Sequence, residues 1–211
     1  MKTYAVKEMF LTLQGEGAHA GRVSVFCRFA GCNLWTGREA DRATAICRFC
    51  DTDFVGTDGI GGGRFASASD LARAVANLWP GTDGKPYVVF TGGEPLLQID
   101  TALIDAMHTL GFEIAIETNG TLPVPAGIDW VCVSPKIGSE LKVFAGDELK
   151  LVYPQEDSEP SIYLPLSFTH FWLQPMDGLE QAKNIRATVE YCLTHPQWRL
   201  STQTHKLLGI A

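Results

Sequence analysis

The sequence lacks several features that would place a protein in a membrane, outside the cell or on a nucleic acid. None of its hydrophobic runs approaches the ~18 residues that a membrane-spanning helix needs. The first residues, MKTYAVKEMF, are interrupted by charged side chains and contain no apolar stretch of the kind found in secretory signals. Lysine and arginine form no cluster, and the net charge is −7, which argues against nucleic acid as a partner. We therefore expect a cytoplasmic protein that binds neither membrane nor nucleic acid.

The sequence also gives no sign of a disulfide framework, although it contains six cysteines. Half of them lie in strand-like or helical patterns, where a free cysteine is ordinarily a small buried residue: Cys27, Cys132 and Cys192. The other three, Cys32, Cys47 and Cys50, lie in the polar stretch AGCNLWTGREADRATAICRFCDTDF (30–54). These three are the candidates for metal or cluster ligands.

Short apolar segments bounded by turn residues recur along the chain. They are rich in β-branched and aromatic residues and mostly do not alternate, as expected of strands buried on both faces. The predicted strands are VSVFCRF (23–29), YVVFTGG (87–93), EIAIETN (113–119), WVCVSP (130–135), ELKLVY (148–153) and FWLQPM (171–176). Helical periodicity with capping or stop signals predicts helices over 69–79, 100–110 and 178–195. Alternating strands and helices predict a mainly parallel sheet.

The length favours one α/β domain. A complete eight-stranded barrel typically needs about 250 residues, and this chain has 211. We therefore expect a partial, open (β/α)6-type barrel with a reduced number of helices. Its expected parts are an N-terminal hairpin over 1–22, a core barrel over 23–177 and a C-terminal helix and capping tail over 178–211. The glycine-rich DGIGGGR (58–64) does not match GxGxxG and follows no predicted strand, so we interpret it as a flexible loop.

The spacing of the three candidate cysteines suggests a metal centre. Cys47 and Cys50 form a C-x2-C pair, which allows two thiolates to reach one metal or cluster. Cys32 directly follows the first predicted strand, and in parallel barrels such positions lie at the rim that holds the active site. Three thiolates suit a [4Fe–4S] cluster, whereas structural zinc normally takes four ligands; His19 or Asp51 as a fourth has no recognised zinc spacing. Ligand count favours the cluster but leaves zinc open.

Polar motifs follow the later predicted strands and extend this pattern. They are TGGEP (91–95), ETNG (117–120), SPK (134–136) and LQPM (173–176). Because the carboxyl ends of parallel strands meet at one rim, these motifs should lie together. Together with the cysteine loop, in which Phe49 is the aromatic residue before the last cysteine, they resemble the radical S-adenosylmethionine (SAM) superfamily. The chain departs from the superfamily pattern by having fourteen residues, not three, between Cys32 and Cys47.

Within that superfamily, the chain is similar to the 7-carboxy-7-deazaguanine synthase family over nearly its whole length. Further matching segments are LQGEG (13–17), CRFAGCNLW (27–35), CDTDF (50–54), TGGEPLLQ (91–98), LKLVY (149–153) and LSTQTHKLLGI (200–210). Members of the family vary in the loop between the first two cluster cysteines, which accounts for the insertion. The resemblance implies a radical SAM lyase that converts 6-carboxy-5,6,7,8-tetrahydropterin to 7-carboxy-7-deazaguanine with loss of ammonia. This reaction belongs to the biosynthesis of queuosine, a tRNA modification, and of other 7-deazapurines.

The resemblance also implies roles for individual residues. The cluster ligands would be Cys32, Cys47 and Cys50, and one electron would cleave SAM to methionine and a 5′-deoxyadenosyl radical, with SAM regenerated at the end. SAM would be bound by Phe49, Asp51, Gly93, Glu94, Glu117, Ser134, Lys136, Gln174 and Asp177. The carboxypterin would be bound by Leu13, Gln14, Glu16, Arg28, Thr91, His205 and Ala211. Thr52 would be the one protein ligand of Mg²⁺. A structural role stays open for each, such as an internal ion pair for Arg28.

Two other functions remain compatible with parts of the sequence. A radical SAM activating enzyme for a glycyl radical protein would share the cysteine loop but would not explain LQGEG or QTHK. A non-catalytic zinc-binding module would be colourless, whereas an iron–sulfur protein is brown. For the enzyme, we expect a flavodoxin-type or similar electron donor and a homodimer; the sequence does not identify the reductant or the dimer contact.

Overall fold

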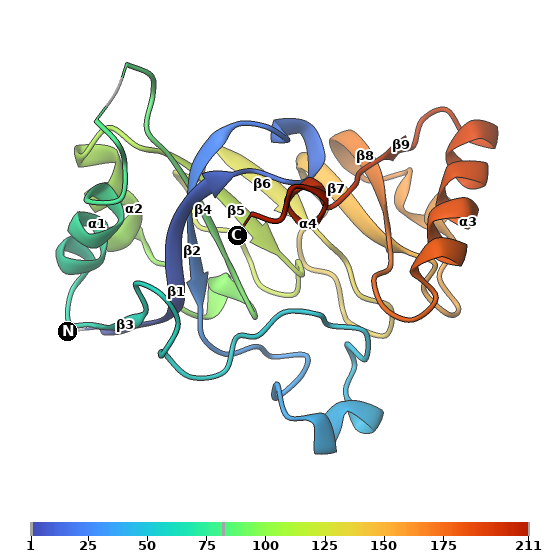
Figure 1. Cartoon of the computed structure of the whole chain (residues 1–211), viewed down its shortest axis with the longest axis horizontal. Helices are drawn as coiled ribbons and strands as arrows, with labels where there is room; N and C mark the ends of the chain where they lie inside the picture. The colour runs from blue at the N-terminus through green and yellow to red at the C-terminus, as the bar shows by residue number, and fades with distance from the viewer. Residues whose placement is uncertain (1, 82, 211) are drawn as a thin grey trace.

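The computed structural model describes residues 2–81 and 83–210. Its strands form one curved sheet in the order β3-β1-β2-β4-β5-β6-β7-β8-β9 (Figure 1). The strands are β1 (Tyr4–Leu13), β2 (Val23–Phe29), β3 (Gly63–Phe65), β4 (Tyr87–Gly92), β5 (Glu113–Thr118), β6 (Trp130–Val133), β7 (Ala145–Tyr153), β8 (Ser167–Pro175) and β9 (Arg199–Leu200). From β2 to β9 every neighbouring pair is parallel, whereas β1 pairs antiparallel with β2 and β3. The expected α/β class and open partial barrel are confirmed.

Helices cover only part of the outer face of this sheet. The α-helices are α1 (Ala68–Ala76), α2 (Thr101–Thr109), α3 (Gln181–Thr194) and α4 (Thr204–Leu208). Short 3-10 turns are η1 (Gly17–His19), η2 (Glu39–Thr44), η3 (Pro95–Leu97) and η4 (Pro160–Tyr163). The described segments between β5 and β6 and between β6 and β7 contain no helix, which agrees with the expected reduced number of helices. Among the described helices, none has the length and hydrophobicity required to cross a bilayer.

The α2 helix has its expected cap, Asp100, whereas α1 begins at Ala68, one residue before the expected start at 69, and is capped by Ser67. The Ser67 hydroxyl accepts a hydrogen bond from the Asp70 amide at 3.1 Å, and the Asp100 carboxylate accepts one from the Leu103 amide at 3.1 Å. Each side chain satisfies a backbone N–H that has no partner inside the helix. The two helices therefore start at fixed points and return the chain along the outer face of the sheet.

The central strands are buried on both faces, which explains their unalternating apolar sequences. In β4, Val88 and Phe90 belong to the main core, which packs against α1 and α2. The intervening Tyr87 and Val89 belong to a separate inner cluster with Ala115 of β5. A second outer core lies around β7, β8 and α3. The alternate residues of one strand thus serve two hydrophobic clusters.

The N-terminal segment closes one end of the barrel. Residues 1–22, expected to form a hairpin, supply only the strand β1, and β2 completes the hairpin. In the connection between β1 and β2, His19 Nδ1 and the Tyr87 hydroxyl form a hydrogen bond of 2.7 Å. The His19 ring also stacks on Trp130, with ring centroids 4.1 Å apart. Arg22 forms a bidentate pair with Glu113 at 2.7 and 2.9 Å. Since Tyr87, Glu113 and Trp130 each begin a strand, this segment lies at the amino-terminal end of the sheet.

The glycine-rich segment 58–64 is held against β1, so its interpretation as a flexible loop was wrong. The Gly59 amide donates to the Lys7 carbonyl at 2.9 Å, and the Met9 amide donates to the Ile60 carbonyl at 2.7 Å. A Cβ atom on Gly62 would lie 2.2 Å from the Lys7 carbonyl oxygen. Glycine is needed here because two backbones approach closely, which composition alone did not reveal.

Substitution of Gly62 by alanine tests this docking. We expect Gly62→Ala to destabilise the fold by about 1–3 kcal/mol, because the added methyl group meets backbone and cannot be accommodated by a side-chain rotation. The free energy of unfolding from urea titration measures the effect. Ile60→Ala is the matched control in the same segment, since Ile60 is 79% exposed, and it should change stability by less than about 0.5 kcal/mol. Equal stabilities of the two variants would contradict the close approach.

Candidate active site

A cavity of about 430 Å³ opens at the carboxyl ends of the parallel strands. Its volume is within the range of small-molecule sites. The wall combines the ends of β4 to β8 with three segments outside the parallel sheet: the turn 13–16, the cysteine loop 32–54 and the tail 203–206. Parallel pairing therefore brings the polar motifs of the sequence to one place.

Nearly all the residues expected from the sequence line this cavity. They are Leu13, Gln14, Glu16, Arg28, Cys32, Cys47, Phe49, Cys50, Asp51, Thr52, Thr91, Gly93, Glu117, Ser134, Lys136, Gln174, Asp177 and His205. Two of the expected residues are not among them. Ala211 lies outside the residues that the structure describes, and Glu94 is buried behind the wall.

Glu94 supports the rim from within the fold. Its carboxylate accepts hydrogen bonds from the Thr118 hydroxyl at 2.7 Å, the Asn119 amide at 2.8 Å and the Leu96 amide at 3.0 Å. Burial raises the pKa of Glu94 in spite of these bonds. The carboxylate thus ties the turn after β4 to the end of β5, and Gly93 is the residue of this motif that faces the cavity.

The fourteen-residue insertion between the first two cysteines returns to its starting point. The backbone amide of Cys47 donates to the Leu34 carbonyl at 3.3 Å, which closes the loop close to Cys32. Arg42 stacks over the Trp35 ring at 4.0 Å and donates to the Cys50 carbonyl at 3.1 Å. The insertion is therefore folded back on itself, and its length does not separate the cysteines.

The three thiols Cys32, Cys47 and Cys50 are free and line the same wall of the cavity. Among the described residues, no three His, Cys, Asp or Glu side chains are placed to hold a single metal ion. Lys136 lies beside this wall, with its ammonium donating to the carbonyl and hydroxyl oxygens of Ser134 at 2.6 and 2.7 Å. Several thiols with a cation beside them fit a multinuclear cluster, which takes thiolate ligands and carries net negative charge.

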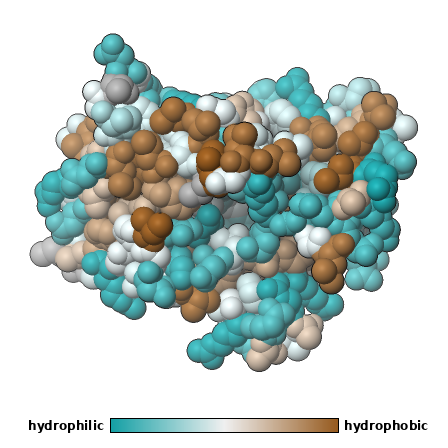
Figure 2. Space-filling view, in the orientation of Figure 1, coloured by the Kyte–Doolittle hydropathy of each residue, from teal (hydrophilic) through white to brown (hydrophobic). Residues whose placement is uncertain are grey.

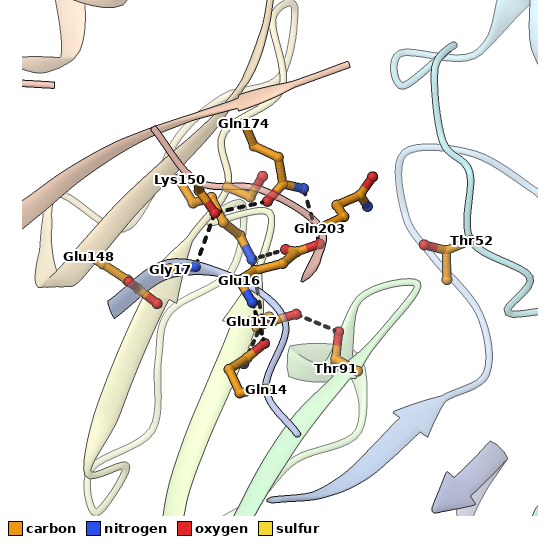
Figure 3. Close-up of polar contacts among 12 residues, drawn as sticks. Gln14, Glu16, Gly17, Thr52, Thr91, Glu117, Glu148, Lys150, Gln174 and Gln203 are labelled. Atoms are coloured by element: carbon orange, nitrogen blue, oxygen red, sulfur yellow. Dashed lines mark hydrogen bonds and ion pairs between the residues drawn. The ribbon is translucent and has the colours of Figure 1, made fainter. Parts of the chain in front are cut away.

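A buried ionic network occupies the opposite side of the cavity (Figure 3). Lys150 of β7 contacts Glu16 directly and lies 3.4 Å from Glu117 of β5. Gln14 donates to Glu117 at 3.2 Å and Gln174 donates to Glu16 at 3.1 Å. Burial alone would lower the pKa of Lys150, but Glu117 and Glu16 outweigh it and hold that pKa well above its usual value.

Lys150 lies in the matching segment LKLVY (149–153), but the sequence did not identify it as a site residue. A signal was present, because a lone lysine inside an apolar strand requires a charged or polar partner once it is buried. Its neighbours Leu149 and Leu151 belong to the outer core, so period-2 geometry directs Lys150 to the inner face.

Arg28 and Glu8 form a pair at the edge of the cavity. The Arg28 Nε donates to Glu8 Oε1 at 2.8 Å, and both residues line the cavity. A guanidinium group has five N–H donors in a fixed plane. Glu8 therefore fixes the orientation of Arg28 through Nε, and both the internal ion pair and a ligand contact by the terminal nitrogens are compatible with this geometry.

The C-terminal segment lies across the cavity mouth. Figure 1 shows α4 in front of the sheet, next to the turn that follows β1. The Thr204 amide donates to the Gly15 carbonyl at 3.0 Å, and a Cβ atom on Gly15 would lie 2.2 Å from Nδ1 of His205. Glycine at position 15 thus lets the two ends of the chain pack together and brings His205 to the cavity.

Lys206 holds this segment in place through ion pairs, and the sequence did not identify it as a site residue either. Its ammonium lies 2.8 Å from the Asp51 carboxylate and 2.5 Å from that of Asp177. Burial raises the pKa of Asp51, but the contacts with Lys206 outweigh this and the net shift is downward. The tail is therefore linked by charge to the cysteine loop and to the segment after β8.

Comparisons with known proteins agree on one group of enzymes. Residues 41–191 match the family model of the Radical SAM superfamily. The chain is 66% identical over 99% of both chains to 7-carboxy-7-deazaguanine synthase of Bradyrhizobium diazoefficiens. It is 65% identical to the same-named protein of Bordetella pertussis over 98% of this chain and 99% of that protein. A crystal structure of QueE from Escherichia coli superposes with a TM-score of 0.71 at 28% identity, covering 96% of this chain and 95% of the other.

Removal of the Lys206 charge should loosen the tail. Two partly exposed ion pairs are worth about 0.2–1 kcal/mol each, so we expect amide hydrogen exchange in 203–210 to become roughly 2–30-fold faster in Lys206→Met. Mass spectrometry of exchanged peptides measures this. The matched control is Lys183→Met, because Lys183 also forms an exposed ion pair but lies on α3. Unchanged exchange in the tail of Lys206→Met would show that other contacts hold it.

Proposed function

The chain belongs to the 7-carboxy-7-deazaguanine synthase family of the radical SAM superfamily, and we propose that it catalyses the reaction of that family. It is a radical SAM lyase that converts 6-carboxy-5,6,7,8-tetrahydropterin to 7-carboxy-7-deazaguanine with loss of ammonia. The observation that carries this assignment is 66% identity across 99% of both chains. The cavity supports it, because residues of nearly every motif of the resemblance line that one space.

The cysteine wall is the proposed site of the cluster and of SAM. Cys32, Cys47 and Cys50 would hold a [4Fe–4S] cluster, which together with SAM supplies one-electron radical chemistry when both are bound. Gly93 leaves room beside Cys32, since a Cβ atom on Gly93 would lie 2.8 Å from the Cys32 Cβ. The residues proposed to contact SAM from the surrounding wall are Phe49, Asp51, Glu117, Ser134, Lys136, Gln174 and Asp177. Glu94 would act on SAM only through the rim that it supports.

The opposite side is the proposed substrate site. Glu16 and Gln14 present an acceptor and a mixed donor–acceptor group, which suit the aminopyrimidinone edge of a pterin. Arg28, oriented by Glu8 through Nε, would bind the substrate carboxylate with its terminal nitrogens. His205 would cover the substrate, because its ring lies against Gly15. Thr91 and Leu13 complete this wall, and the tail above it would exclude water from reactive species.

Reconstitution under anaerobic conditions tests the function directly. We expect the wild-type protein to take up about four irons and four sulfides per chain and to form product from SAM and the carboxypterin. Cys32→Ala should give no product above background because the cluster loses one of three protein ligands. The control is Cys192→Ala on α3, outside the cavity, which should keep activity within a few-fold.

The alternatives predict other results. A zinc-binding module would bind zinc with high affinity and remain colourless after reconstitution. A glycyl radical activase would cleave SAM without consuming the carboxypterin. Either result would contradict the proposed reaction.

We also propose that Thr52 holds Mg²⁺ against the substrate. Thr52 lines the cavity two residues after Cys50, and in Figure 3 it lies apart from the ionic network, on the side of the cysteine loop. A hydroxyl oxygen with substrate oxygens and water is a suitable ligand set for this hard cation.

Thr52→Ala should therefore require at least about 10-fold more Mg²⁺ for half-maximal turnover, whereas Thr52→Ser should behave as the wild type does. The Mg²⁺ dependence of the initial rate measures this difference, and SAM affinity should not change. The same Mg²⁺ dependence in Thr52→Ala and wild type would place the ion elsewhere.

The remaining proposals concern the setting of the enzyme. We propose a cytoplasmic homodimer that receives electrons from a flavodoxin-type donor and contributes to queuosine synthesis for tRNA. The homodimer is supported by large exposed apolar residues, among them Leu179, Leu193 and Leu207. Figure 2 shows hydrophobic surface over α4 and on the side of α3. Light scattering of the reconstituted protein tests the dimer against the 23.0 kDa mass of one chain.

A further inference from the structure

We propose that Lys150 is a positioning residue for the substrate, which holds the carboxylates of Glu16 and Glu117 directed into the cavity. This inference rests on the proposed function, because it assigns the network to recognition of the pterin ring. Lys150 would act through the two carboxylates. Glu16 presents hydrogen-bond acceptors to the N–H groups of the aminopyrimidinone edge, and Glu117, which is also proposed to contact SAM, presents its free acceptor position to the same edge.

The position of Lys150 is the first observation. Its side chain is 6% exposed and faces the cavity from the middle of β7. Figure 3 shows its ammonium between Glu16, from the turn after β1, and Glu117, from β5. A lysine in such surroundings would be strongly disfavoured without its two partners. The three charges must therefore be considered as one unit.

The hydrogen bonds of this unit leave acceptor capacity unused. Glu16 accepts from Lys150 and Gln174. Glu117 accepts from Gln14 and Lys150 on Oε1 and from Thr91 on Oε2 at 3.2 Å. Since an ionised carboxylate offers about four lone-pair sites, each glutamate retains a free position. Those positions are directed by the fixed bonds, which prevent the side chains from turning away from the cavity.

The charge of Lys150 keeps Glu117 as a hydrogen-bond acceptor. Burial opposes ionisation of Glu117, but Lys150, with help from Gln14 and Arg28, lowers its pKa below the ordinary value. Without the ammonium, two carboxylates would share a space of low polarity, and like charges there favour uptake of a proton by one of them. A protonated glutamate donates where the substrate also donates, so recognition of an N–H edge would be lost.

A purely structural role for Lys150 is disfavoured by the other anchors of the 14–22 segment. The Gly17 amide donates to the Ser201 hydroxyl at 3.0 Å, and the Ala18 amide donates to the Glu148 carboxylate at 2.9 Å. Arg22 is bidentate with Glu113 further along the same segment. These contacts hold the turn in place without Lys150, so its charge is available for the orientation and ionisation of the glutamates.

The experiment compares Lys150→Met with Lys150→Arg in the reconstituted enzyme. Loss of a charged hydrogen-bond network costs about 10–150-fold in affinity, and we expect this weakening for the carboxypterin in Lys150→Met. SAM affinity should fall less than carboxypterin affinity, because only Glu117 and Gln174 among the proposed SAM contacts belong to this network. Lys150→Arg should recover most of the substrate affinity. Lys142→Met is the control, since it removes an exposed lysine that pairs only with Glu140 in the described structure.

The pH dependence separates ionisation from packing. The proposed recognition needs Glu117 ionised, and substitution of Lys150 removes the charge that lowers the pKa of Glu117. The ratio of variant to wild-type kcat/KM should therefore increase from about pH 6 to about pH 8.5 in Lys150→Met and stay flat in Lys150→Arg. The other titratable or charged groups that face the network are Arg28 of β2, Cys132 of β6, Glu148 of β7 and His205 of α4. Lys150→Arg keeps the positive charge that these groups face, so it controls for their contribution to the pH profile.

The outcomes distinguish this inference from the proposed function. If the wild type does not convert the carboxypterin, the proposed function is wrong, and the role proposed for Lys150 is then wrong as well. If the wild type is active but Lys150→Met binds substrate as Lys142→Met does, the positioning role is wrong. An equal loss of SAM and substrate affinity with a flat pH ratio would also overturn it. If Lys150→Met does not fold, Lys150→Gln, which donates hydrogen bonds without charge, is measured in its place with the same pH slope expected.

Discussion

Parallel pairing of the strands from β2 to β8 is the constraint on which the candidate site depends. In such a sheet each strand must begin at the same edge, so every connection returns along the outer face and every strand ends at the opposite edge. Side chains separated by dozens of residues, such as Thr91, Glu117 and Gln174, are thereby brought to one cavity. The residues at the carboxyl ends of the strands determine the chemistry of the site. The apolar parts of the strands contribute only by packing in the hydrophobic core.

The open barrel is completed by the two ends of the chain. The segment after β1 runs from the cavity, where it contributes Gln14 and Glu16, to the amino-terminal end of the barrel, where it contributes His19 and Arg22. The tail lies across the cavity mouth. The two meet where the Gly17 amide donates to the Ser201 hydroxyl and the Thr204 amide donates to Gly15. These contacts between the two ends of the chain close the open side of the sheet, which in a complete barrel is closed by additional strands and helices.

The sequence predicted the strands β2 and β4 to β8 and half of the residues that line the cavity, and the physical reasons can be named. Unalternating apolar runs such as VVF in β4 have no other stable place than a sheet covered on both faces, and the parallel arrangement then fixes where their polar ends lie. It did not predict the direction of Glu94, because a carboxylate after a strand can face the cavity or the protein interior. The sequence also did not predict the pairs Lys150–Glu16 and Lys206–Asp51. An ion pair between residues more than a hundred positions apart leaves no local sequence pattern.

The charges of the cavity are arranged in an order that suits two different ligands. Lys150 forms ion pairs with Glu16 and Glu117, Lys206 with Asp51 and Asp177, and Arg28 with Glu8.

Lys136 is different: in the part of the chain that the structure describes, its ammonium is bonded to Ser134 and to no carboxylate. Burial lowers the pKa of Lys136, although Cys47 and Cys50 act in the opposite direction. A cation without a carboxylate beside the thiols attracts an anionic group to that side, whereas the glutamates attract N–H donors to the other. A protein with a net charge of −7 can thus bind an anionic cofactor and a hydrogen-bond-donating ring in one cavity, because charge is separated within the site.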